Sequence, residues 1–165
     1  MADLSRYLPL SNRPAEDESG VTGDRRAELA EIVRIAAALD GGAYFLADAR
    51  LDSEFAGQEL VAVAAAIENG GRRGIRALSD AVRALLRLAG DREVELDPIT
   101  SGAVALYAVT RTPHDRRAVV GGCTLRATDA GWEFGHGPLR AAPARQIVAF
   151  LLGVADVPPP LSSRR

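Results

Sequence analysis

The sequence predicts an α+β fold in which helices precede an antiparallel sheet, and three observations support this prediction. Apolar residues recur at helical spacing over roughly residues 24–89, and glycines interrupt the pattern. After Gly90, apolar residues alternate with polar ones, which is typical of half-buried strands. Near the C-terminus a last apolar stretch returns to helical spacing. Helices and strands segregated in this way are typical of helices packed on one face of an antiparallel sheet.

Three helices and one short strand are expected before Gly90. The first helix covers about residues 24–39 and ends at a pair of glycines, and residues 43–47 follow as a short buried strand. Ser53 is placed to cap a second helix that reaches about Glu68. The third helix, residues 75–89, has the clearest apolar stripe, with arginines and an aspartate on its outer face.

Four to five antiparallel strands and a closing helix are expected after Gly90. The strands are predicted at residues 94–96, 104–109, 118–120, 123–128 and 132–134. Residues 104–109 are apolar on both faces, which predicts a central strand. Asp129, Ala130 and Gly131 predict a tight hairpin, and Pro143 suits the first turn of the closing helix.

The 165 residues fit one domain with extensions at both ends. Residues 1–22 mix prolines, a glycine and an acidic run without apolar periodicity, which predicts a flexible arm. Residues 23–155 are expected to form a single α+β domain, and residues 156–165 a tail rich in proline, serine and arginine.

Composition argues against several classes of protein. The net charge is -2, and acidic residues outnumber basic ones, so neither nucleic acid nor an acidic membrane is an expected partner. No apolar stretch is long enough to span a bilayer, and the N-terminus does not have the pattern of a signal peptide. Cys123 is the only cysteine and has no internal disulfide partner, so we expect a cytoplasmic protein.

All 20 basic residues are arginines, and lysine is absent. Because the arginines are scattered and alanine is abundant, this usage indicates the codon bias of a GC-rich bacterial genome. The absence of lysine excludes a lysine nucleophile or Schiff base.

The loop that precedes the third helix is a candidate anion site. Gly70, Gly71, Arg72 and Arg73 combine flexible backbone with two guanidinium groups at a helix start. The loop is neither a P-loop nor a dinucleotide-binding motif, and the alternative is a helix connection with solvated arginines.

A second candidate site binds a small apolar ligand. Trp132 and Phe134 supply apolar walls, and the glycine-rich turn around His136 forms a lip. Tyr107 lies on the predicted central strand, so we expect it near the same pocket, between the sheet and the helices of residues 60–88. The alternative places the two aromatic side chains in the core.

A catalytic site has few candidate residues. Cys123 and His136 would form the thiolate pair of a thiol or group-transfer enzyme, whereas a cysteine in a strand is more often inert packing. His114 and His136 are the only histidines and have no ligand partner at the spacing of a zinc site, so we expect neither metal nor cofactor.

One part of the chain resembles a known family. Residues 124–132 read Thr-Leu-Arg-Ala-Thr-Asp-Ala-Gly-Trp, and Gly135-His136-Gly137-Pro138 and an apolar helix follow. This arrangement, over about residues 116–153, resembles the C-terminal, sterol-carrier-like domain of the maleylpyruvate isomerase-like, mycothiol-dependent family. The resemblance implies an α+β module with a concave sheet. That family's metal-binding histidines belong to an N-terminal helical bundle, and the first ninety residues here contain no histidine, so no catalytic residue is carried over.

The sequence therefore favours a non-catalytic module that binds a small apolar ligand or a protein partner. A helix pair and a strand with apolar faces must be covered by the core, a ligand or a partner. A homodimer is one way to cover the surplus. The alternative is the thiol or group-transfer enzyme.

Overall fold

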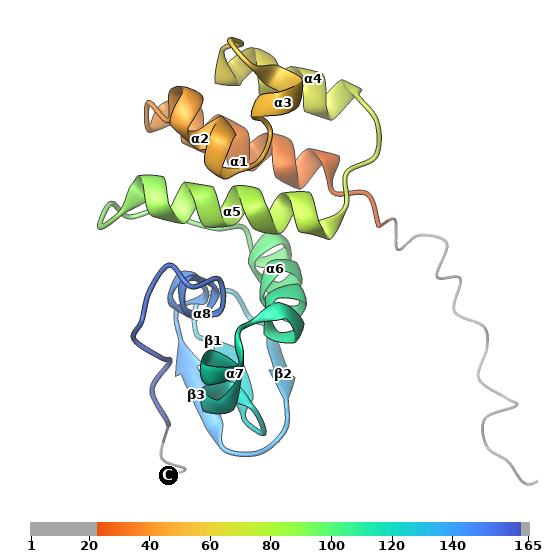
Figure 1. Cartoon of the computed structure of the whole chain (residues 1–165). Coiled ribbons are helices and arrows are strands. Elements are labelled where there is room, and N and C mark those ends of the chain that lie inside the picture. Colours follow the sequence, from red (N-terminus) through yellow and green to blue (C-terminus); the bar gives the residue numbers. More distant parts are fainter. Residues whose placement is uncertain (1–22, 163–165) are drawn as a thin grey trace, which may run out of the picture.

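A computed structural model describes residues 23–162 and shows eight helices with a three-stranded sheet in this part of the chain. The expected arm of residues 1–22 and the last three residues of the tail lie outside the described residues. The helices of residues 26–69 form one layer, the helix of residues 75–89 lies beneath them, and residues 98–151, which include the sheet, form the other side of the molecule (Figure 1). The fold is therefore α+β, but the predicted arrangement of its elements is wrong in several places.

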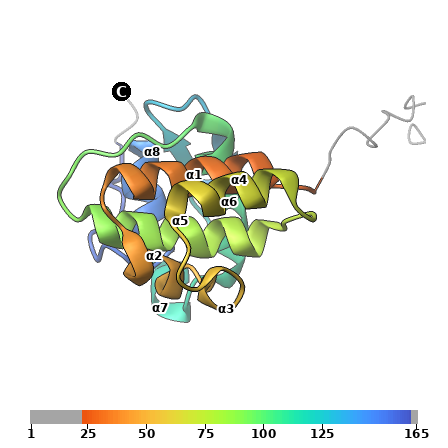
Figure 2. The same ribbon diagram turned by 90° about the horizontal axis from the view of Figure 1, so that it is seen from above.

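The helical layer is built on α1 (Arg26–Ala38) and α5 (Ile75–Ala89), and both agree with the predicted helices. The predicted second helix is two helices, α3 (Asp52–Phe55) and α4 (Leu60–Asn69). Gly57 separates them with a φ of +74°, a conformation that interrupts an α-helix. Figure 2 shows α1, α4 and α5 running alongside one another.

The predicted strand at residues 43–47 is a helix, α2 (Gly42–Asp48). A short apolar run fits a buried strand or a helix equally well, so its periodicity does not decide between them. In the structure Phe45 and Leu46 are buried whereas Tyr44 is 91% exposed, because only one side of the helix contacts the core.

The predicted central strand at residues 104–109 is also a helix, α6 (Pro98–Arg111). Asp97 caps it by accepting a hydrogen bond from the Thr100 N–H at 2.9 Å, and proline at the first helical position favours a helix start. The run is apolar throughout, so it fits either period, and α6 buries Val104 and Ala108 while Leu106 lies exposed.

The strands predicted at residues 94–96 and 118–120 are absent from the described sheet. Residues 94–96 belong to no helix or strand, and residues 118–120 belong to α7 (His114–Val120). Pro113 precedes α7 and Asp115 lies in its first turn, both of which favour a helix N-terminus.

The sheet is mixed and has the order β2-β1-β3. Strands β1 (Thr124–Ala127) and β2 (Glu133–Gly135) form the predicted antiparallel hairpin, with Leu125 opposite Phe134. Strand β3 (Leu139–Ala142), which was not predicted, pairs in parallel with β1. The chain must therefore cross the start of β1 between β2 and β3.

Glycine makes this crossing possible. A Cβ atom on Gly137 would lie 2.0 Å from the carbonyl oxygen of Gly122, and one on Gly135 would lie 2.4 Å from that of Cys123. Both glycines have positive φ, and the Thr124 N–H donates to the Pro138 carbonyl at 2.9 Å. The glycine-rich turn is therefore a backbone crossing within the sheet.

The closing helix α8 (Ala144–Leu151) agrees with the prediction and packs on α6 and β1. One continuous core joins both sides of the molecule and includes Leu29, Val63, Leu85, Val104 and Ile147. The chain after α8 returns along β3, where Leu161 bridges to Arg140. No helix among residues 23–162 combines the length and the hydropathy needed to cross a membrane.

Candidate functional site

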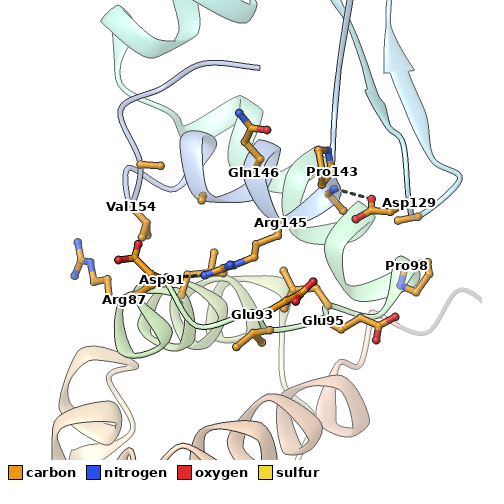
Figure 3. A pocket seen from close by; sticks show the side chains of 18 residues that line it. Arg87, Asp91, Glu93, Glu95, Pro98, Asp129, Pro143, Arg145, Gln146 and Val154 are labelled. Carbon is orange, nitrogen blue, oxygen red and sulfur yellow. Dashed lines mark hydrogen bonds between the residues drawn. The ribbon is translucent and has the colours of Figure 1, made fainter. Parts of the chain in front are cut away.

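A groove lies between α5 and α8, and we call it the α5–α8 groove. It has a volume of about 1300 Å³. Its walls come from the end of α5, the segment of residues 90–98, the hairpin tip at residues 129–130, α8, and residues 154–155 (Figure 3). The groove therefore lies where the helical layer meets the sheet-containing side.

Buried apolar residues form part of the groove lining. Leu86 of α5, Val94 and Leu96 of the connecting segment, and Ala149 of α8 all line it and are buried. Val94 and Leu96 are anchored in the core that joins the two sides of the molecule. An apolar surface at the base of an open groove is the usual setting for binding an apolar group.

A row of acidic side chains follows one wall of the groove. Three exposed acidic residues line this wall: Asp91, Glu93 and Glu95. The last two alternate with the buried residues Val94 and Leu96. None of the three forms an ion pair within residues 23–162. We call Asp91, Glu93 and Glu95 the acidic row.

The two arginines of the groove are already engaged. Arg87 forms an ion pair with Asp48 of α2 at 2.8 Å. Arg145 donates to the carbonyl oxygen of Gly90 at 2.6 Å and connects α8 to the end of α5 (Figure 3). The carboxylates that line the groove outnumber its two arginines, so the groove carries a net negative charge.

Asp129 has a structural partner at the other end of the groove. Its Oδ1 accepts a hydrogen bond from the Ala144 N–H at 2.7 Å (Figure 3). Pro143, the residue at the N-cap position of α8, makes no side-chain cap of its own. Asp129 therefore caps α8 from the hairpin.

The four residues predicted to bind an apolar ligand do not line the groove. Trp132 and Phe134 stack with ring centroids 5.6 Å apart, and the Trp132 Nε1–H donates to Ser101 Oγ at 3.0 Å. Tyr107 lies on α6, with the Arg111 guanidinium 5.5 Å from its ring centroid, and His136 is exposed at the β2–β3 crossing. Their binding role stays a prediction.

Cys123 and His136 lie one residue beyond the end of the β1–β2 pairing, where Thr124 lies opposite Gly135. The Cys123 thiol, however, lies 4.0 Å from the Val119 carbonyl, and no hydrogen bond joins the two side chains in the described structure. The thiol-enzyme hypothesis stays a prediction. No group of three or more metal-ligating side chains occurs within residues 23–162.

The predicted anion loop precedes α5, and one of its two arginines is engaged. Arg73 makes two hydrogen bonds to the Glu54 carboxylate, at 2.8 and 2.5 Å, and its guanidinium lies 5.8 Å from the Phe55 ring centroid. These hydrogen bonds lower the pKa of Glu54, although partial burial opposes the shift. Arg72, Gly70 and Gly71 remain candidates for an anion, and this site stays a prediction.

The α5–α8 groove is not among the sites that the sequence predicts. The available signal is the alternation of acidic and apolar residues over positions 93–97, which predicts a sheet strand. Alternation reports that one side is buried, but not whether the exposed side faces open solvent or a groove.

Comparison with known proteins gives no match: no family model fits the chain, and no characterised protein or solved structure is detectably similar to it. The resemblance of residues 116–153 to the mycothiol-dependent family therefore stays a prediction.

Proposed function

We propose that this chain is a non-catalytic binding module that holds an apolar segment of a protein partner in the α5–α8 groove. The observation that carries the proposal is the groove itself. Buried apolar residues of the core line it, and it lies between the two sides of the molecule. Its composition supports binding, because apolar walls supply affinity and polar groups at the edge orient the ligand.

The size of the groove favours a protein segment over a small molecule. Its volume of about 1300 Å³ exceeds the roughly 300–1,000 Å³ of typical small-molecule pockets. The groove is also open to solvent rather than closed into a cavity. A segment of chain laid in such a groove buries apolar side chains along its length.

Selection from a displayed library of random peptides, with the purified full chain as bait, tests the proposal. We expect enriched peptides that bind much more weakly to Gln146→Trp, because Gln146 lines the groove and an indole there adds bulk to its α8 wall. Arg76→Trp adds the same side chain to the exposed surface of α5 outside the groove, and it should leave binding unchanged.

Two results would contradict the proposal. Peptides that bind the wild-type chain and Gln146→Trp equally would show that the groove is not the binding surface. A stoichiometric small-molecule adduct in native mass spectrometry, lost in Gln146→Trp, would assign the groove to a small apolar ligand instead.

The homodimer also stays a prediction. Ile99 and Leu106 are exposed apolar side chains separated by two turns of α6, so they lie on one side of the helix. Sedimentation equilibrium measures the association directly, and Leu106→Arg should give a monomer if this side of α6 is the interface.

A further inference from the structure

We infer that the partner segment carries arginine or lysine side chains among its apolar ones, and that the acidic row recognises them. This inference rests on the proposed function, because it specifies the chemistry of the segment that the α5–α8 groove binds. It follows from the placement of the charges around the apolar surface.

The acidic row is positioned to contact a ligand in the groove. Val94 and Leu96 point into the core, so the side chains that alternate with them point outward. Asp91, Glu93 and Glu95 also line the groove, so their carboxylates lie along its edge rather than on a remote surface. In Figure 3 these three side chains follow one another along the segment that runs beside α5.

The other charged groups of the groove have partners within the fold. Arg87 is paired with Asp48, Arg145 with the Gly90 carbonyl, and Asp129 with the Ala144 N–H. Neither arginine therefore neutralises the acidic row through an ion pair in the described structure. A bound cation would complete the electrostatics of the groove, and charges of opposite sign across an interface specify the partner.

A metal ion and a nucleic acid fit the groove less well than a protein segment. No group of three or more metal-ligating side chains is found in the described residues, so the acidic row does not form a metal site there. Nucleic acid carries phosphates, which an acidic groove repels. A protein segment supplies both the cation and the apolar side chains that the inner surface needs.

The composition of the groove-dependent peptides selected above tests the inference. We expect them to combine apolar residues with arginine or lysine, and to bind less tightly as salt concentration rises. The triple variant Asp91→Asn, Glu93→Gln, Glu95→Gln keeps the shape of the acidic row and removes its charge. Fluorescence anisotropy should show that the peptides bind about tenfold more weakly, since each exposed ion pair contributes only a small part of the binding free energy.

The matched control is Asp52→Asn, Glu59→Gln, Asp115→Asn, which removes the same charge from exposed positions outside the groove and should leave affinity unchanged. Circular dichroism establishes that both triple variants are folded. Enriched peptides without basic residues, or with equal affinity for the wild-type chain and the acidic-row variant, would overturn the inference while leaving the groove as the binding site. Absence of any groove-dependent peptide would refute the proposed function itself.

Discussion

At the scale of single residues, side chains distant in sequence complete the local structure. Asp129 caps a helix that begins fifteen residues later, and Arg73 joins the start of α5 to α3 through Glu54. The spacing of residues in the sequence predicts neither contact, because only the fold brings these residues together. These contacts give two predictions about stability.

Asp129→Ala should lower the free energy of unfolding by about 1–2 kcal/mol, because the first N–H of α8 loses its acceptor and the helix dipole loses a negative charge. Asp129→Asn retains an oxygen acceptor and should cost less. Urea denaturation measures both. Equal unfolding midpoints for Asp129→Ala and the wild-type chain would show that this cap contributes nothing to stability.

The Glu54–Arg73 pair should make stability depend on pH. The hydrogen bonds from Arg73 lower the pKa of Glu54 in the folded chain, so the pair stabilises the fold when the carboxylate is ionised, and this contribution is lost as the pH falls through the lowered pKa. The pair is partly exposed, which limits the effect to less than about 1 kcal/mol.

Comparison of the wild-type chain with Glu54→Gln measures this contribution. The difference in unfolding free energy should shrink as the pH falls through the lowered pKa of Glu54. Glu59→Gln, at an exposed position without an ion pair in the described structure, is the control and should keep a constant difference. A Glu54→Gln difference independent of pH would refute the linkage.

At the scale of elements, backbone geometry determines where strands and helices meet. The β2–β3 connection crosses the start of β1 at a distance that only glycine permits, and Gly131 closes the hairpin with a φ of +69°. Gly71, by contrast, has open space around it and an ordinary φ. Substitution of these glycines by alanine should therefore destabilise the fold to different degrees.

Gly137→Ala should destabilise the fold most, by at least about 3 kcal/mol, because strain at positive φ adds to a collision with the Gly122 carbonyl. Gly131→Ala suffers strain alone and should cost about 1 kcal/mol. Gly71→Ala should change stability by no more than about 0.5 kcal/mol. Thermal unfolding followed by circular dichroism ranks the three, and any other order would contradict the crossing geometry.

At the scale of the whole molecule, one core joins the helical layer to the sheet-containing side. Val94 and Leu96 continue this core beneath the groove, and Arg145 bridges the groove's two walls. The two sides should therefore unfold together, as small single domains usually do.

Leu85→Ala tests this cooperativity. Leu85 is fully buried in α5, so its truncation should lower the free energy of unfolding by about 2–5 kcal/mol. Trp132, the only tryptophan, reports on the sheet-containing side, whereas circular dichroism reports mainly on the helices. Both signals should shift by the same amount. A fluorescence transition that stays in place while the ellipticity transition moves would show that the two sides unfold independently.

Several elements were predictable because their signals are local. The stripe of α5, the hairpin of β1 and β2 and the start of α8 at Pro143 all follow from periodicity or turn chemistry within a few residues. The all-apolar run of residues 104–109 was not decidable in the same way, because such a run satisfies both periods. Asp97 as a helix cap, followed by Pro98 at the first helical position, is the local signal for a helix.

By itself, the sequence determined that the chain has a helical first half, a hairpin followed by a closing helix, and enough apolar residues for one core, because these depend on neighbours along the chain. Only the tertiary structure decided that β3 pairs in parallel with β1, that Arg87 turns to Asp48, and that the acidic row lies along an apolar groove. The physical reason is that pairing and enclosure are made between segments far apart in sequence, whereas periodicity reports only which side of each segment is buried.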